Sequence, residues 1–217
     1  ENEKKDIAAS TQKIYEYFFL KIIKYGLSLY ESKNLCLSGG CALNSSANGK
    51  IKENLDIEKV FIPYAPGDGG GAIGSALIVL KNKFSTIKFT NLQNPYLGPK
   101  YDDKYINLII KKIPKENFNI NYFDENDLCD LVAKKISNGR IIGWFQNRIE
   151  FGARALGNRS ILADPRNPNM RDILNIKIKR REKFRPFAPS IISDKKNEWF
   201  DQDYFNSYME VVLKIKK

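Results

Sequence analysis

Arginine is confined to one part of this sequence, although lysine occurs throughout it. All nine arginines lie between Arg140 and Arg185, together with three lysines and four acidic side chains. This stretch therefore carries most of the chain's formal net charge of +11. A guanidinium group holds phosphate or carboxylate through two parallel hydrogen bonds, which an ammonium group cannot do. The confinement predicts an anion-binding site in residues 140–185, which we call the arginine window.

Five cations of the arginine window are the candidates for contact with an anionic substrate. They are Arg154, Arg159, Lys179, Arg181 and Arg185. Arg154 and Arg159 flank the turn Gly157-Asn158, which we expect to position both side chains. Several fixed guanidinium groups would offset the repulsion between two phosphorylated reactants and stabilise charge that shifts between oxygens in the transition state. The window therefore suits chemistry on a small phosphorylated compound.

The other charged side chains of the window have structural interpretations. Three arginines are expected to be solvated or paired with nearby Asp172 and Glu182, namely Arg140, Arg171 and Arg180. Arg166 follows Asp164-Pro165, and both bracing of that turn and substrate contact remain open for it. Glu150 is expected to orient an arginine, with a role as a general base as the alternative.

Two glycine-rich turns in the first part of the chain suit a nucleotide. Residues 38–44 stand where a strand is followed by a helix, so glycine backbone approaches a ligand there and free N–H groups face an anion. Residues 66–74 repeat this pattern with Gly69 and Gly70 and add one acid, Asp68. A lone carboxylate in a glycine loop suits a metal ion or a metal-bound phosphate. Tight turns and a helix cap are the structural alternative for each turn alone, but together they favour a nucleotide site.

The elements that hold these turns follow an alternating order. The pattern predicts helix 7–30, strand 35–37, helix 41–53, strand 60–62, loop 65–71 and helix 72–80. Helices that alternate with short apolar strands are typical of an α/β layer. Residues 83–100 lose this periodicity and contain Pro95, Gly98 and Pro99, so we expect a linker and a domain boundary near residues 90–100.

The elements beyond the linker lead into the arginine window. Asp124 is the expected N-cap of a helix whose apolar positions end at Ile136, and Gly139 is placed to terminate that helix. Residues 141–145 read as a buried strand. Three aromatic side chains in and after this strand are expected in the core rather than stacked on a base: Trp144, Phe145 and Phe187.

Composition excludes several classes of chemistry. The sequence lacks histidine, which excludes Ser-His-Asp and Cys-His nucleophiles and histidine metal sites within this stretch. Cys36, Cys41 and Cys129 are odd in number and lack zinc-ligand spacing, so they are expected to be reduced, buried thiols. The arginines stand among Gly, Asp, Pro, Phe and Leu, and not among the exposed aromatics of a nucleic-acid surface. A basic nucleic-acid-binding module is therefore the disfavoured alternative.

The sequence also bears on location and completeness. No apolar run approaches the roughly 20 residues that cross a bilayer. Neither an initiator Met nor a signal peptide opens the sequence. We therefore expect a cytoplasmic fragment with no membrane partner.

Four stretches resemble one enzyme family. Residues 37–44 (LSGGCALN) and 66–74 (PGDGGGAIG) are similar to the end of the nucleotide-binding domain of O-carbamoyltransferases of the nodulation-factor and antibiotic-tailoring type. Residues 143–166 and 179–190 resemble two motifs of the family's YrdC-like domain, although Asn147 stands where the family frequently has Gly. The resemblance implies an α/β protein: a partial actin-like ATPase (ASKHA) domain over 1–90, a linker over 91–104 and a truncated YrdC-like domain over 105–217.

The resemblance also assigns roles to residues. It implies that Gly39, Gly40 and Asn44 contact the nucleotide and that Asp68 is one ligand of a divalent metal, of the iron or magnesium class. The other ligands, histidines and an acid, would lie outside this fragment. Lys179-x-Arg181 resembles the Lys-x-Arg pair of YrdC-like domains, so we expect Lys179 and Arg181 to be catalytic together with Arg154. The substrate-binding residues expected are Arg148, Arg159, Ser160 and Arg185.

The activity implied is carbamoyl transfer. Carbamoyl phosphate and ATP would give a carbamoyl adenylate, and a hydroxyl group of a sugar or other small-molecule acceptor would then take the carbamoyl group. The fragment alone is expected to be inactive, because half of the first domain is absent. A nucleotide-binding homologue without activity is the alternative, and a homo-oligomer is compatible with the sequence.

Overall fold

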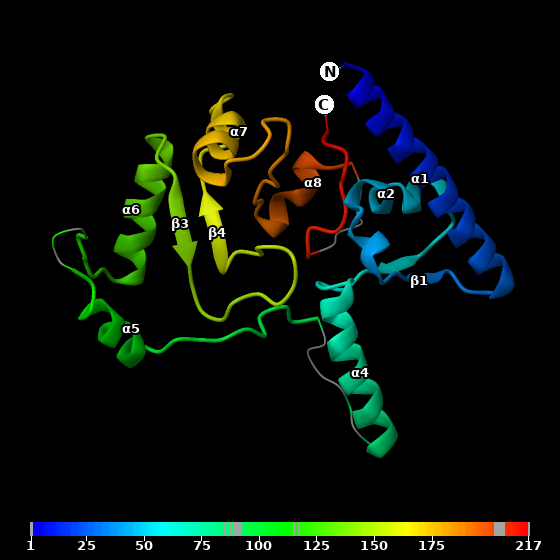
Figure 1. Ribbon diagram of the computed structural model, residues 1–217, viewed down its shortest axis with the longest axis horizontal. Helices are drawn as coiled ribbons and strands as arrows, with labels where there is room; N and C mark the ends of the chain where they lie inside the picture. Colours follow the sequence, from blue (N-terminus) through cyan, green and yellow to red (C-terminus); the bar gives the residue numbers. More distant parts are fainter. Residues whose placement is uncertain are drawn as a thin grey trace. The chain divides into compact units, whose positions relative to one another are not determined.

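The computed structural model describes residues 2–84, 86, 88, 93–114, 116, 118–201 and 207–216. Its helices and strands agree with the expected α/β class (Figure 1). Contacts divide the chain into two units, which we treat separately. Unit 1 comprises Glu1–Asn94, Gly152–Arg154 and Ile192–Lys217, and unit 2 comprises Pro95–Phe151 and Ala155–Ile191. No helix in the described part of the chain is both long and apolar enough to span a membrane.

Unit 1 begins with an alternation of helices and strands. Its elements are α1 (Asn2–Leu29), β1 (Asn34–Cys36), the 3-10 turn η1 (Gly40–Leu43), α2 (Ser45–Gly49), α3 (Ile51–Asn54), β2 (Lys59–Phe61) and α4 (Asp68–Lys83), followed by the 3-10 turn η4 (Ser193–Lys195) and α8 (Lys196–Trp199) near the end of the chain. Strands β1 and β2 are parallel, with Leu35 opposite Val60. The predicted helix 7–30 and both predicted strands are confirmed to within a few residues at each end.

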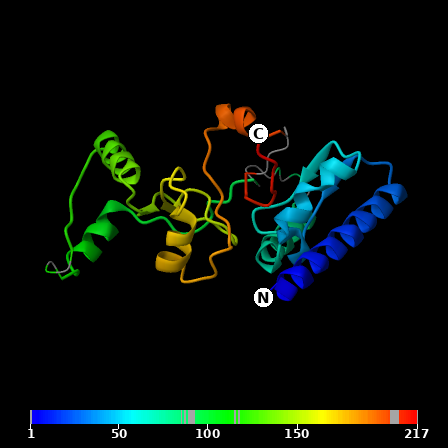
Figure 2. The same cartoon turned by 90° about the horizontal axis from the view of Figure 1, so that it is seen from above.

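The core of unit 1 lies where α1 covers this small sheet (Figure 1, Figure 2). Ile23, Ile51 and Ile57 are buried, and other apolar side chains pack against them: Phe19, Leu20, Leu27, Leu35, Leu37, Leu55 and Val60. Only some of the apolar side chains of α1 are buried. Ile14 and Ile22 are exposed among the described residues, whereas the buried stripe runs through Phe19, Ile23 and Leu27.

Two predictions about the glycine-rich stretches were wrong in detail. The single helix expected over 41–53 is three short segments, because Asn44 starts a new helix as an N-cap and the chain turns again at Lys50. The loop expected over 65–71 ends early, because α4 already begins at Asp68. Gly70 N and Gly71 N both bond to Gly67 O, so these glycines belong to the first helical turn.

Unit 2 contains α5 (Asp103–Ile110), α6 (Glu125–Ser137), strands β3 (Ile142–Phe145) and β4 (Arg159–Leu162), α7 (Met170–Ile173) and a π-helical segment, η3 (Leu174–Lys179). The helix predicted after Asp124 is confirmed as α6: the Asp124 side chain accepts from Asp127 N at 2.9 Å, and Gly139 follows the helix end with φ +78°. Strands β3 and β4 are antiparallel, with Phe145 opposite Arg159.

Two expectations about burial were wrong. Strand β3 is half-buried with alternating sides, and the Phe145 side chain is 52% exposed, because no described element covers that face. Trp144 and Phe187 are partly buried. The cysteines are free, as expected, but all three are exposed. Cys36, for example, lies on the exposed side of β1, whose burial alternates.

The passage from unit 1 to unit 2 falls between Asn94 and Pro95, within the stretch where a linker is predicted. Residues 91 and 92 of that linker lie outside the described residues. The units are not continuous in sequence, because Gly152–Arg154 and the last 26 residues, Ile192–Lys217, lie with unit 1. The domain division drawn from the resemblance stays a prediction.

Candidate functional site

The two glycine-rich turns meet in one cleft of unit 1. Gly39 N donates to Pro66 O at 2.6 Å, so the turns are bonded to each other directly. The cleft has a volume of about 510 Å³ and is lined by residues of both turns and of strand β2 and helix α4. Gly39 has φ +89°, a left-handed conformation that favours glycine, and no other atom approaches its Cα on the side where a Cβ would stand. Backbone is therefore open to a ligand at this point.

The cleft contains some of the predicted nucleotide residues and not others. Gly39, Asp68 and Gly70 line it, whereas Gly40, Asn44 and Gly69 do not. The Asn44 side chain is used inside the protein, since its Oδ1 accepts from Ala47 N at 3.1 Å and its Nδ2 donates to Gln12 Oε1 at 3.0 Å. Asn44 thus supports the first turn from behind and does not face the cleft.

The described residues do not make a metal site by themselves. Asp68 is the one carboxylate of the cleft lining. Within the described ranges, no three His, Cys, Asp or Glu side chains are grouped to hold a metal ion. A metal here would need ligands from elsewhere, so we derive no step through one.

Glu150 is the organising carboxylate at the start of the arginine window, within unit 2. Its Oε1 accepts three backbone N–H groups, from Leu156 at 2.7 Å, Asn158 at 2.9 Å and Arg159 at 3.2 Å. Burial raises the pKa of Glu150, but these N–H groups outweigh burial and hold the pKa below its usual value. Glu150 is therefore a charged anchor of the turn, and it orients Arg159 through the backbone.

Two of the predicted cations are held by the protein itself. Arg148 donates from Nε to Gly98 O at 2.9 Å and from Nη2 to Leu97 O at 3.1 Å, so its guanidinium fixes the start of unit 2. Arg181 donates from Nε to Asn175 Oδ1 at 2.7 Å and lies over the Phe187 ring at 4.8 Å. These contacts leave part of the Arg181 guanidinium fork for a ligand and fix its plane.

Asn175 explains the shape of the second half of the window. It is fully buried, and its Nδ2 donates to Lys183 O at 3.1 Å and to Arg185 O at 2.9 Å. With the bond from Arg181, this one amide joins η3 to the loop that follows. The sequence patterns did not point to Asn175, because a buried Asn in an apolar stretch has no periodic signal.

Three further arginines pair with acids. Arg166 binds Asp164 through Nε at 2.9 Å and Nη2 at 2.7 Å. Of the two roles left open for Arg166, these bonds favour bracing of the turn over substrate contact. Arg171 pairs with Asp172 at 3.3 Å, as expected. Arg185 pairs with Glu182 at 2.9 Å, with both side chains about half exposed, so solvent and ligands compete readily for it.

Arg159, Lys179 and Ser160 are the more available candidates in unit 2. The side chains of Arg159 and Lys179 make no hydrogen bond or ion pair with any residue that the structure describes. Arg159 begins strand β4, and Lys179 ends η3. Ser160 Oγ accepts from Gly157 N at 3.2 Å, which closes the turn that Glu150 anchors.

Arg154 differs from the others because it belongs to unit 1. Its Nε lies 3.7 Å from Oε1 of Glu210, a fully buried carboxylate. Burial raises the pKa of Glu210, although Arg154 acts in the opposite direction. Asn48 Nδ2 donates to Glu210 O at 2.8 Å, so Glu210 is tied to the helix behind the first glycine turn. The sequence patterns gave no sign of Glu210.

Two models of one protein family match most of this chain. Residues 1–77, with both glycine turns, match the family model described as the carbamoyltransferase N-terminus. Residues 133–217, with the arginine window, match the one described as the carbamoyltransferase C-terminus. The chain belongs to the carbamoyltransferase family.

Individual relatives match nearly the whole of this chain. The chain is 41% identical to an uncharacterized protein of Synechocystis over 98% of this chain and 35% of that protein. It is 36% identical to the nodulation protein NolNO of Sinorhizobium fredii over 91% of this chain and 29% of that protein. It is 34% identical to the nodulation protein NolO of Bradyrhizobium diazoefficiens over 91% of this chain and 36% of that protein. The chain thus spans about a third of the length of these relatives.

Proposed function

We propose that this chain is part of an O-carbamoyltransferase that uses carbamoyl phosphate and ATP. Carbamoyl phosphate, ATP and water would give carbamoyl adenylate, orthophosphate and pyrophosphate. A hydroxyl group of a sugar or another small-molecule acceptor would then attack the carbamoyl carbon and release AMP. The finer assignment of unit 1 to an actin-like ATPase fold and of unit 2 to a YrdC-like fold belongs to the same proposal.

The main support for the proposal is the cleft of unit 1, which occurs in a chain of the carbamoyltransferase family. Two glycine turns, far apart in sequence, bond to each other and line one cavity of about 510 Å³. A cavity of this size lies within the range of sites for small molecules and cofactors. The first turn of α4 adds backbone N–H groups, which favour anions. ATP fits these features, and when bound it would supply the adenylyl group.

The residues of the arginine window would bind the carbamoyl donor. Arg159 and Lys179 offer cationic groups without a partner among the described residues, and Arg181 offers a fork whose plane is fixed by Asn175 and Phe187. Fixed cations lower the barrier of phosphate chemistry because they need no reorganisation as negative charge moves. Arg148 and Arg166 would act indirectly, because their guanidinium groups hold the fold.

A cleft-filling variant tests the nucleotide site. Gly71 lines the cleft, and no atom lies within 4 Å of a Cβ built on it, so Gly71→Leu places a side chain into the cavity without a clash at its Cβ. We expect the full-length protein to bind ATP and this variant to bind it at least about tenfold more weakly, a loss of about 1.4 kcal/mol. Isothermal titration calorimetry measures both.

The matched control is Gly26→Leu. Gly26 is also a helical glycine with open space around its Cβ position, but it lies outside the cleft lining. ATP affinity within about twofold of wild type is expected for it, a change below about 0.5 kcal/mol. Equal ATP affinity in wild type and Gly71→Leu, or no ATP binding by wild type, would overturn the assignment of the cleft.

A further inference from the structure

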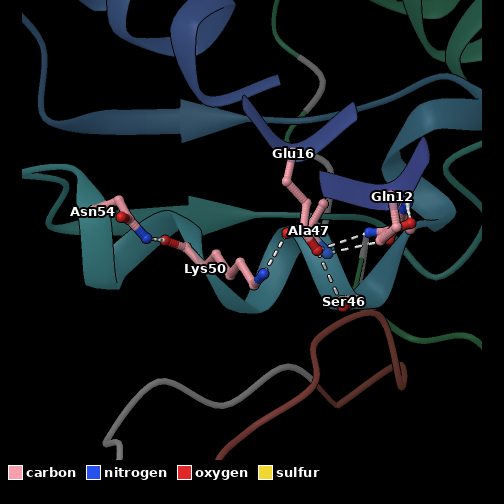
Figure 3. Close-up of polar contacts among 7 residues, drawn as sticks. Gln12, Glu16, Ser46, Ala47, Lys50 and Asn54 are labelled. Atoms are coloured by element: carbon pink, nitrogen blue, oxygen red, sulfur yellow. Dashed lines mark hydrogen bonds and ion pairs between the residues drawn. The ribbon is translucent and has the colours of Figure 1, made fainter. Parts of the chain in front are cut away.

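One face of helix α1 carries three polar side chains that all reach the segment behind the first glycine turn. Gln12, Tyr15 and Glu16 are three and four positions apart, so they lie on the same side of the helix. Each contacts the stretch between Cys41 and Lys50. Figure 3 shows Gln12 and Glu16 pointing from α1 toward α2.

Gln12 forms a two-way amide pair with Asn44. Gln12 Nε2 donates to Asn44 Oδ1 at 3.2 Å, and Asn44 Nδ2 donates to Gln12 Oε1 at 3.0 Å. Asn44 Oδ1 also caps α2 by accepting from Ala47 N at 3.1 Å. The pair therefore fixes the residue at which η1 ends and α2 begins.

Glu16 gathers donors from both helices (Figure 3). Its Oε1 accepts from Gln12 Nε2 at 2.8 Å and from Ser46 Oγ at 3.4 Å, and its Oε2 binds the Lys50 ammonium. Glu16 is only 7% exposed. Burial raises its pKa, but Lys50 and the other donors outweigh burial and lower the pKa below its usual value. A buried carboxylate with this many donors has a well-defined position, because an unmade bond there is costly.

Tyr15 adds a bond to the middle of the same segment. Its hydroxyl group donates to Cys41 O at 3.1 Å. The same carbonyl group of Cys41 also accepts from Asn44 N at 3.1 Å. The next residue, Ala42, donates from its N–H to Gly39 O at 3.1 Å. The contacts of α1 are thus connected by short backbone bonds to Gly39, the residue of this turn that is bonded to Pro66 and lines the cleft.

We propose that Gln12 and Glu16, assisted by Tyr15, are positioning residues that hold the Gly39 turn of the cleft in the conformation that receives the nucleotide. This inference rests on the proposed function, because it assigns the cleft to ATP. The apolar contacts of α1, through Phe19, Ile23 and Leu27, anchor the helix to the sheet separately. The polar contacts of α1 therefore act on the local geometry of the turn, whereas its apolar contacts attach the helix to the sheet.

Two variants test this role in the full-length protein. Gln12→Ala removes the amide pair, and Tyr15→Phe removes one hydroxyl group at almost constant volume. We expect amide hydrogen exchange at residues 42–48 to become about fivefold faster in Tyr15→Phe, as loss of one ordinary hydrogen bond implies. Exchange should become faster still in Gln12→Ala, which loses the amide pair and the bond to Glu16. We expect ATP to bind at least about threefold more weakly to Gln12→Ala at a temperature where it is fully folded. Thr11→Ala is the matched control, because among the residues that the structure describes the Thr11 hydroxyl bonds only within α1, to Ile7 O.

The outcomes separate the two proposals. Unchanged exchange at residues 42–48 in Gln12→Ala and Tyr15→Phe would overturn the positioning role, whether or not ATP binds. Faster exchange with unchanged ATP affinity would also overturn it, since it would show that Gln12 supports only the fold. Absence of ATP binding by the wild-type protein would instead defeat the proposed function, while the exchange measurement would still report on whether Gln12 and Tyr15 hold the Gly39 turn.

Discussion

At the scale of single residues, the arginine window divides into cations that hold the protein and cations that are available. Confinement of arginine predicted the window, but it did not separate these two groups. The separation depends on partners such as Asn175 for Arg181 and Glu210 for Arg154, which are 6 and 56 positions away in sequence. Composition and spacing report none of these pairings, because they arise from the folded chain.

The ionisation of Asp164 should make the stability of the protein depend on pH in the acid range. The guanidinium and backbone N–H of Arg166 lower the pKa of Asp164 from its usual 3.8 to about 2. Because the pKa of Asp164 is lower in the folded state, its ionised form stabilises the protein at pH values above the usual pKa of 3.8. This contribution is lost as the pH falls from 3.8 to about 2. Asp164→Asn should therefore be less stable than wild type at pH 6, and the difference should shrink toward pH 2.

Denaturant unfolding at several pH values measures this difference. Asp172→Asn is the control, because the ion pair of Asp172 with Arg171 is exposed and should contribute little. If the difference in unfolding free energy between Asp164→Asn and wild type stays constant down to pH 2, the lowered pKa of Asp164 is contradicted.

Glu210 should have the opposite pH dependence. Burial raises the pKa of Glu210 above its usual 4.5, so the folded protein binds this proton more tightly than the unfolded chain does. Stability from this group is therefore lost as the pH rises through the window that begins at 4.5. Glu210→Gln removes the titration, so its stability relative to wild type should rise between pH 4.5 and pH 7.5. A relative stability that falls over this range, measured by denaturant unfolding, would show that the ion pair with Arg154 dominates.

At the scale of elements, prediction succeeded where local signals agree and failed where short segments follow one another. Helix α6 was predicted with its N-cap, Asp124, because the cap and the apolar spacing point to the same residue. The stretch from Cys41 to Glu53 was predicted as one helix, because the role of Asn44 as an internal N-cap becomes visible only once its side chain is seen bonded to Ala47 N. Asn147 has φ +50°, a left-handed conformation that asparagine adopts more readily than most residues.

Two adjacent glycines of α4 should respond in opposite ways to the same change. A Cβ on Gly70 would lie 1.9 Å from Ala65 O, whereas one on Gly71 would meet nothing within 4 Å. Gly70→Ala should destabilise the protein by about 1–3 kcal/mol through overpacking. Gly71→Ala should stabilise it by about 0.5–1 kcal/mol, because alanine loses less backbone entropy in a helix. Thermal melting compares the two, and equal effects would contradict the close approach of Ala65 O to Gly70.

At the scale of the whole molecule, the chain carries a cleft lined by two glycine-rich turns and an arginine window in one sequence of the carbamoyltransferase family. The α/β class was predictable from the alternation of helices and strands, whereas the nucleotide and anion sites inferred from the glycine turns and the arginine window stay predictions. The placement of Gly152–Arg154 and of the final residues with unit 1 was not, because it rests on contacts between distant segments, such as Val212 N with Ser45 O.

The most direct measurement is pyrophosphate release from ATP by the full-length protein, with and without carbamoyl phosphate. If the chain belongs to an active O-carbamoyltransferase, pyrophosphate should form only when both compounds are present, together with an equal amount of orthophosphate. The account would be contradicted if the protein binds ATP but releases no pyrophosphate in response to carbamoyl phosphate with any divalent metal. That result would identify a nucleotide-binding homologue without transfer activity.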